Sequence, residues 1–267
     1  MAYLMAGQLS ELERLRLQSR VWEPAGESLL ARLGAGQGLR VLEAGCGSMG
    51  WLRILSRWVG DEGEVVGTDV DDKMLEVAHT LCDEEPLRNV RLLHDDIFAS
   101  TLPQASFDLV HLRFQLAPLG RAPEQVTTAL RLVKPNGWIV LEDPDTGSWR
   151  ENPLAPSAAH LRSLIVDAFI QSGGNLNAGR RLPEYLQAAG IDSQIRCECI
   201  ALEPGHPYLQ LPIQFATSLR PRLLQLIDEL ELDRLLDAAK MELSDPNRWG
   251  VTFTLVQAWG RARPSSQ

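Results

Sequence analysis

The chain has 267 residues and a hydrophobic content of 45%, which is typical of a globular protein with a substantial buried core. Its 26 Lys and Arg residues against 35 Asp and Glu residues give a net charge of −9. An acidic chain without a dense basic run repels the phosphate backbone, so we expect no nucleic-acid partner. No stretch approaches the roughly 18 apolar residues of a membrane span and no signal-peptide pattern is present, so we expect a cytoplasmic protein without membrane contact. The four cysteines lack the spacing of a metal site, and we expect no bound metal.

Short apolar runs alternate with amphipathic runs from residue 39 onward. Nearly continuous apolar strands that alternate with helices are typical of a parallel sheet covered by helices on both faces. The sequence therefore predicts a doubly wound α/β fold, whose ligands bind beyond the carboxyl ends of the strands. We expect strands at 41–44, 65–68, 90–93, 107–112 and 138–142, and helices at 50–59, 72–82 and 123–133.

The alternation stops after the fifth strand. A helix is predicted at 153–172, a sixth strand at 194–202, and a leucine-rich helical block at 212–243 that is broken at Pro221. The segment 251–260 has few breakers and is predicted as one long strand. This order suggests that the last two strands pair antiparallel at one edge of the sheet.

The domain organisation follows from these elements. Residues 1–33 resemble an amphipathic helix or a pair of helices, and we expect them to form an N-terminal helical lid. Residues 34–267 would then form the α/β domain, with helical insertions at about 147–180 and 206–247. Both additions are placed to cover a ligand site, although packing on the surface is an alternative for each.

A glycine-rich turn follows the first strand, with Gly45, Gly47 and Gly50 in the spacing G-x-G-x-x-G. This spacing alone favours a nicotinamide or flavin dinucleotide, so a dinucleotide-dependent oxidoreductase is one hypothesis. Glu43, however, stands two residues before the first glycine. A carboxylate there would crowd a pyrophosphate but suits a ligand that carries an ammonium group.

Two further carboxylates end neighbouring strands. Asp69, at the end of the second strand, is able to accept hydrogen bonds from both hydroxyls of a ribose. Asp96, after the third strand, is placed to accept from an adenine amino group, with the backbone of Ile97 at the ring and Asp95 as a competitor for the role. Three carboxylates on successive strand ends fit adenosine plus an amino acid, which indicates S-adenosylmethionine.

These residues resemble the class I S-adenosylmethionine-dependent methyltransferases. The resemblance extends over about residues 35–260 and includes the segments 106–110, 132–138 and 179–183. The chain is most similar to the small-molecule branch, which contains ubiquinone and menaquinone biosynthesis methyltransferases and natural-product methyltransferases. The resemblance implies a Rossmann-like, doubly wound seven-stranded sheet with an antiparallel last strand. Met49 stands where the family usually has its third glycine.

The resemblance implies a cofactor, S-adenosyl-L-methionine, with S-adenosyl-L-homocysteine as its product. Glu43 would hold the ammonium group, Asp69 would hold the ribose, and Arg113 would bind the cofactor carboxylate or else an acidic substrate. Val70 and Met74 would pack against the adenine or ribose, and simple core packing is the alternative for both. The expected cofactor-binding residues are Glu43, Gly45, Cys46, Gly47, Asp69, Val70, Met74, Asp96, Ile97 and Arg113.

Candidate catalytic groups lie at the ends of the fourth and fifth strands. His111 is a candidate base, because an imidazole titrates near neutral pH, and this favours an oxygen acceptor over nitrogen or carbon. The alternative is a hydrogen-bonded strand residue. Asp143, in the acidic segment 142–145, is a second candidate that would accept a substrate proton or attract a cationic acceptor, with ordinary loop solvation as the alternative. Phe114 and Trp149 are expected walls for an apolar acceptor.

The expected function is methyl transfer to a small molecule in secondary metabolism or quinone-like biosynthesis, by a protein that forms a homodimer or acts alone. A methyltransferase fold that binds the cofactor but catalyses a different reaction is a further alternative. Gln18 and Tyr3 would reach the cofactor if the N-terminal helix folds over the site.

Overall fold

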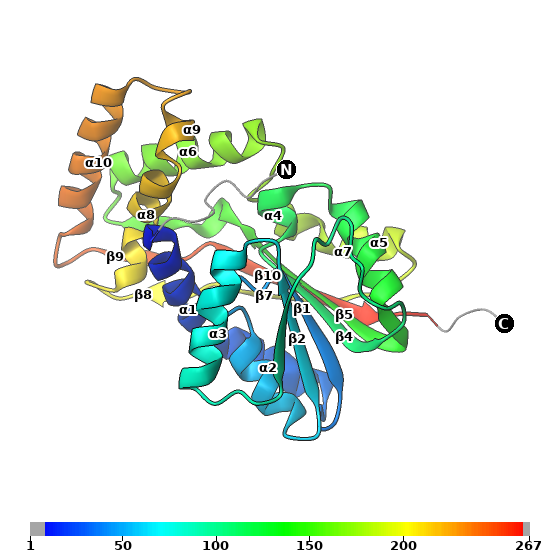
Figure 1. The fold of residues 1–267 in the computed structure, drawn as a ribbon. Helices are drawn as coiled ribbons and strands as arrows, with labels where there is room; N and C mark the ends of the chain where they lie inside the picture. The colour runs from blue at the N-terminus through cyan, green and yellow to red at the C-terminus, as the bar shows by residue number, and fades with distance from the viewer. Residues whose placement is uncertain (1–8, 264–267) are drawn as a thin grey trace.

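The structure is a computed structural model that describes residues 9–263, so Tyr3 lies outside the described residues. Seven strands form one sheet in the order β3-β2-β1-β4-β5-β10-β7 (Figure 1). The first five strands are mutually parallel, and β10 runs antiparallel to β5 and to β7. The predicted seven-stranded sheet with an antiparallel last strand is therefore confirmed. The strands are β1 (Arg40–Ala44), β2 (Glu64–Asp69), β3 (Val90–His94), β4 (Phe107–Arg113), β5 (Val133–Asp145), β7 (Gln194–Glu198) and β10 (Thr254–Arg261).

Helices cover both faces of this sheet (Figure 1). Neighbouring residues of one strand point to opposite faces, and both faces are buried: Val41 packs in one hydrophobic cluster and Leu42 in the other. One face carries α1 (Leu9–Leu33), α2 (Leu52–Val59) and α3 (Asp72–Glu84), and the other carries α4 (Leu116–Leu119), α5 (Ala122–Leu132) and α7 (Leu182–Ala188). The continuous apolar strands of the sequence thus reflect burial on two sides.

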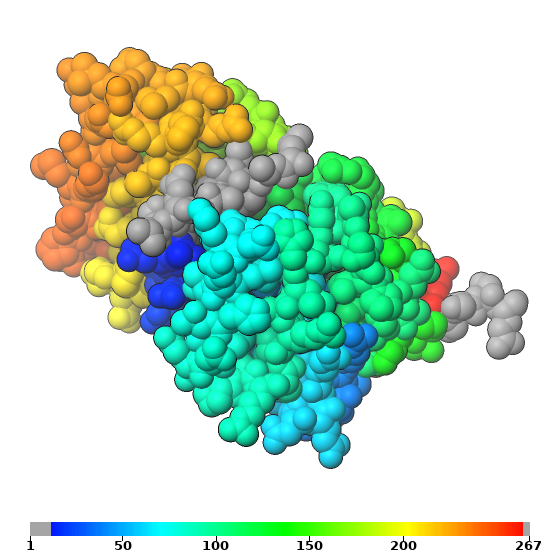
Figure 2. All heavy atoms as spheres, viewed as in Figure 1, coloured from blue at the N-terminus to red at the C-terminus, as the bar shows by residue number. Residues whose placement is uncertain are grey.

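The remaining helices gather beside α1 and form a cap at one end of the sheet (Figure 2). They are α6 (Pro156–Gln171), α8 (Leu211–Ser218), α9 (Arg220–Leu223) and α10 (Glu229–Leu243). Asp228 begins α10 by accepting a hydrogen bond from the Glu231 N–H at 2.9 Å, which satisfies a donor that the helix leaves free. Within the described residues, no helix is both long and apolar enough to cross a membrane.

A second, three-stranded sheet was not predicted. It contains β6 (Arg150–Asn152), β8 (Ala201–Leu202) and β9 (Trp249–Val251), in the order β6-β9-β8. The predicted strands 194–202 and 251–260 are each broken, because both leave the main sheet at the same point. There Thr252 donates its N–H to the Ile200 carbonyl at 3.0 Å and accepts the Ile200 N–H through its hydroxyl at 2.9 Å. Phe253 is buried at the break, where its ring lies near those of Trp22 and Tyr208.

Candidate functional site

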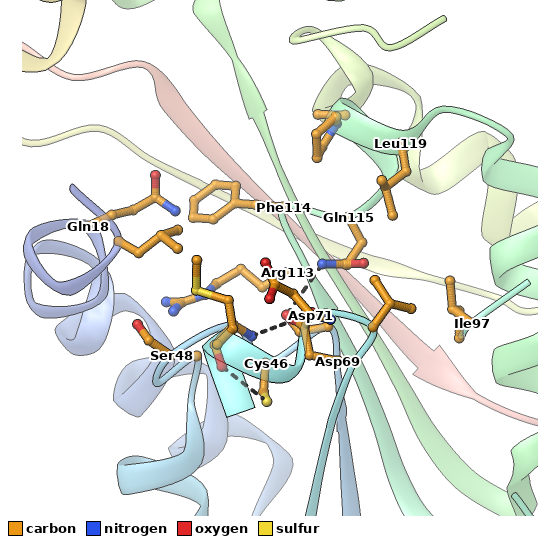
Figure 3. Close-up of a pocket in the computed structure, with 18 of the residues that line it drawn as sticks. Gln18, Cys46, Ser48, Asp69, Asp71, Ile97, Arg113, Phe114, Gln115 and Leu119 are labelled. Carbon is orange, nitrogen blue, oxygen red and sulfur yellow. Dashed lines mark hydrogen bonds between the residues drawn. The ribbon is translucent and has the colours of Figure 1, made fainter. Parts of the chain in front are cut away.

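A pocket of about 690 Å³ opens at the carboxyl ends of β1, β2 and β4, under the N-terminal half of α1. Figure 3 shows Gln18 and Phe114 on one side of this pocket and Ile97 on the opposite side, with Asp69 between them. The ten predicted cofactor-binding residues all line the pocket: Glu43, Gly45, Cys46, Gly47, Asp69, Val70, Met74, Asp96, Ile97 and Arg113. The two predicted catalytic residues, His111 and Asp143, do not line it.

The glycines of the turn have positive φ angles, of 66° at Gly45, 55° at Gly47 and 48° at Gly50. A Cβ atom on Gly45 would lie 2.1 Å from Nε2 of Gln115, and one on Gly50 would lie 2.5 Å from Oε1 of Glu43. At Gly47 the nearest heavy atom to such a Cβ would be 3.9 Å away. A side chain at Gly45 or Gly50 would therefore displace Gln115 or Glu43, whereas Gly47 leaves its space open to a ligand.

Glu43 lies behind this turn and is 1% exposed. Its Oε1 accepts a hydrogen bond from the N–H of Trp51 at 3.1 Å. Trp51 precedes the first residue of α2 and makes no capping hydrogen bond through its own side chain, so Glu43 satisfies a free N–H at the start of this helix. Its Oε2 pairs with Nδ1 of His111. Glu43 thus lines the pocket, caps α2 and bonds to a strand residue, so it connects the glycine turn to the sheet.

His111 is fully buried in the sheet and does not face the pocket. Its Nε2 lies 3.3 Å from Oε2 of Glu142, and its ring stacks on Trp51 with the ring centres 3.8 Å apart. Burial lowers the pKa of the imidazole, but Glu43 and Glu142 outweigh it and raise the pKa to about 9. A buried, positively charged ring does not fit the predicted role of a base that meets the acceptor, and the alternative of a hydrogen-bonded strand residue describes it better.

Asp143 is also fully buried. Its carboxylate accepts hydrogen bonds from the N–H groups of Leu116 at 3.2 Å and Ala117 at 2.9 Å, the first residues of α4. Burial raises the pKa of this carboxyl to about 8. Its position corrects the expectation that it accepts a substrate proton: the structure shows it anchoring α4, whose residues Ala117 and Leu119 line the pocket.

One side of the pocket is built around Asp69. Its two oxygens accept hydrogen bonds from the N–H groups of Gly47 and Asp71, each at 2.9 Å, and burial raises its pKa. Met74 and Ile97 are buried beside it, whereas Val70 is half exposed. Asp96 is exposed and accepts from the Phe98 N–H at 2.9 Å, whereas Asp95 is buried and bonded to Thr101.

The opposite side of the pocket carries a buried guanidinium group. Arg113 is 7% exposed, and its Nη2 donates to the Ser19 hydroxyl at 3.4 Å. Its Nη1 has no hydrogen-bond partner among the described residues. Because a buried donor without a partner is costly, this group calls for an anionic ligand, and a free carboxylate fits. The residues present therefore fit S-adenosylmethionine.

An aromatic cluster extends beyond Arg113. Phe253 lies 5.8 Å from Phe114 and 6.4 Å from Trp149, and Trp149 lies 6.2 Å from Phe215, between ring centres. Phe114 and Trp149 were predicted as walls from the sequence. Phe215 and Phe253 were missed, because they come from α8 and from the break after β9, and no local motif marks either one.

Comparison with known proteins agrees with this geometry. Residues 41–137 match a family model described as "Methyltransferase domain". The chain is 30% identical over 118 residues to demethylmenaquinone methyltransferase of Listeria welshimeri, covering 43% of this chain and 50% of the relative. It is 33% identical over 117 residues to the enzyme of that name from Geobacillus kaustophilus, covering 43% and 49%. The chain thus spans about half the length of the curated relatives it matches.

Solved structures share the fold over a greater length. The YcgJ protein of Bacillus subtilis matches with a TM-score of 0.59 and 17% identity, over 90% of this chain and 98% of that chain. Phosphoethanolamine N-methyltransferase 2 of Haemonchus contortus, solved in complex with S-adenosyl-L-methionine, matches with a TM-score of 0.54 and 19% identity, over 89% and 52%. Together with the turn, Asp69 and the sheet order, these findings show a methyltransferase domain at residues 41–137, in a fold that the solved methyltransferases share and with a pocket that fits S-adenosylmethionine.

Proposed function

We propose that the protein transfers the methyl group of S-adenosylmethionine to a small, apolar acceptor that contains an aromatic ring. The observation that carries this proposal is the division of one pocket into two chemically different sides. Asp69 and Arg113 offer an anion and a cation that suit the ribose and the carboxylate of the cofactor, and the aromatic cluster next to Arg113 suits a flat, apolar molecule.

The cofactor, when bound, supplies an activated methyl group, so the protein chiefly needs to align the acceptor with it. We propose that Asp69 accepts from the ribose hydroxyls, that Glu43 attracts the ammonium group, and that Arg113 binds the carboxylate. Asp96 and Ile97 would bind the adenine, with Val70 and Met74 against the adenosine. We further propose that α1 serves as a lid, because Arg14, Leu15 and Gln18 line the pocket from above.

The acceptor atom is a finer proposal. The described side chains at the aromatic side include Phe114, Trp149, Phe169, Phe215 and Phe253, and none of these is able to take a proton. His111 and Asp143 are buried outside the pocket and do not reach the acceptor. The acceptor would therefore need a nucleophilic group that loses its proton to water without a protein base. An acidic hydroxyl on an aromatic ring meets this condition, and it keeps oxygen as the proposed acceptor atom.

The test is to incubate the protein with S-adenosylmethionine and a panel of hydroxylated aromatic metabolites, quinols among them, and to measure S-adenosylhomocysteine by mass spectrometry. Turnover of ring hydroxyls is expected, with aliphatic amines as the negative set. Cofactor that binds without being consumed, while an acceptor changes, would favour the non-methylating alternative. A larger melting shift with NADH than with S-adenosylhomocysteine would favour the oxidoreductase hypothesis.

Placement in secondary metabolism or quinone-like biosynthesis stays a prediction, as do a homodimer and the lack of a nucleic-acid partner. The relatives named demethylmenaquinone methyltransferase support a quinol as one member of the panel.

A further inference from the structure

A row of buried polar side chains crosses the main sheet beneath α1 and α2. It takes one residue from each of five neighbouring strands: Glu43 of β1, His111 of β4, Glu142 of β5, Gln257 of β10 and Arg196 of β7. The first four are at most 1% exposed. Four buried polar residues in one row of an apolar sheet are costly unless every polar atom is satisfied.

Hydrogen bonds join the row from end to end. His111 bonds Glu43 through Nδ1 and Glu142 through Nε2, and the Gln257 amide donates to Oε1 of Glu142. Arg196 donates to Oε1 of Gln257 at 2.9 Å. Both Arg196 and Gln257 also donate to the Ala25 carbonyl of α1, at 3.2 and 3.3 Å. The row therefore connects the cofactor turn at one end with α1 at the other.

The geometry indicates the charge of the imidazole. Each ring nitrogen of His111 faces a carboxylate oxygen, and a neutral imidazole has only one N–H to donate. The other oxygens of the two carboxylates also act as acceptors, from the Trp51 N–H and the Gln257 amide. With an acceptor on either side, the ring is satisfied when both of its nitrogens carry protons.

Glu43 carries this arrangement to the cofactor turn. Its Oε1 occupies the space that a side chain on Gly50 would need, and it holds the Trp51 N–H that begins α2. The Gly50 carbonyl, in turn, accepts from the Ser19 hydroxyl of α1 at 2.8 Å. We propose that His111 is a positioning residue whose imidazolium holds Glu43 at the cofactor turn, so that cofactor affinity depends on the charge of this ring.

This inference rests on the proposed function, because cofactor binding is its readout. The charged groups around the ring are Glu43 of β1, Glu142 and Asp143 of β5, and Arg113, which follows on the same face of β4. The α2 helix contributes the uncharged Trp51. Removal of one carboxylate is expected to lower the pKa of His111 by about one to two units.

The experiment compares the wild type with Glu142→Gln. Calorimetry measures S-adenosylhomocysteine affinity at about pH 6 and about pH 8.5, and the variant-to-wild-type ratio cancels the titration of the ligand's own amino group. We expect the two proteins to agree within about twofold at the lower pH and to differ roughly three- to twentyfold at the higher pH, as that pKa change requires. Glu151→Gln is the matched control, since Glu151 is buried in an ion pair with Arg162 away from the row.

NMR titration of the five histidine rings, with His111→Gln as the assignment reference, should place the His111 pKa near 9 in the wild type. A loss of affinity in Glu142→Gln that is equal at both pH values, or a His111 ring that titrates near 6.5, would overturn the inference. If Glu142→Gln does not fold, the wild type alone is tested with 5′-methylthioadenosine, which lacks the titrating α-amino group of S-adenosylhomocysteine. Wild-type affinity for this ligand that is unchanged up to about pH 10 overturns the inference. A wild type that binds neither ligand at any pH refutes the proposed function instead.

Discussion

Replacement of Asp69 by Ala tests the assignment of the ribose. Each hydrogen bond to a charged group contributes about 1.5–3 kcal/mol, and two ribose hydroxyls would share this carboxylate. The substitution also removes the acceptor of the Gly47 and Asp71 N–H groups, which loosens the turn. We therefore expect a loss of at least about 3 kcal/mol in S-adenosylhomocysteine binding, or more than about 100-fold in Kd by calorimetry. Asp167→Asn, an exposed change on α6, is the control and should bind as the wild type does.

A pair of ligands separates ribose binding from a loosened turn. The wild type should bind 5′-methylthioadenosine much more tightly than its 2′-deoxy analogue, because the analogue lacks one of the hydroxyls that Asp69 accepts. Asp69→Ala should bind the two about equally weakly. If the variant prefers the ribose form as strongly as the wild type does, Asp69 does not hold the ribose, and the placement of the cofactor in the pocket is wrong.

Three further predictions follow from the same pocket. Arg113→Ala should weaken S-adenosylhomocysteine binding but leave 5′-methylthioadenosine unaffected, since only the former has a carboxylate; equal losses for both would contradict the carboxylate role. Gly50→Ala should lower the free energy of unfolding in urea by about 2 kcal/mol or more, through its positive φ and its contact with the carboxylate behind it, and Gly47→Ala should lower it less while weakening cofactor binding. Because the folded pKa of His111 is raised to about 9, its stabilising effect, about 3 kcal/mol at most, is complete below about pH 6.5 and is lost as the pH rises through 9. The urea midpoint of the wild type should fall as the pH rises from about 6.5 to 9, and the midpoint of His111→Gln should change less over this range. Asp143, whose pKa is raised to about 8, also lowers stability as the pH rises, between about pH 4 and 8.

The side of the pocket around Asp69 could be predicted from the sequence because its residues lie at or just after strand ends. Glu43 is the last residue but one of β1 and Asp69 is the last of β2, and the carboxyl ends of neighbouring parallel strands meet at one edge of a sheet. The aromatic side could not, because Phe215 and Phe253 reach the pocket only through the packing of α8 and the break after β9. His111 was misassigned for a related reason: a residue near a strand end points either to the pocket or into a helix layer, and only the neighbours Glu43 and Glu142 decide which.

The buried histidine also suggests how Glu43, inside the sheet, would attract a positively charged cofactor. A lone buried carboxylate raises its own pKa and becomes neutral, which would remove its attraction for an ammonium group. The imidazolium lies between Glu43 and Glu142, and the two carboxylates keep it charged. A paired carboxylate costs less to bury than an unpaired one, and Glu43 would attract a cation in the adjacent pocket. It follows that His111→Gln should weaken the binding of S-adenosylmethionine, which carries a sulfonium, more than that of neutral 5′-methylthioadenosine; equal losses in calorimetry would show that the ring shapes the turn without contributing to its charge.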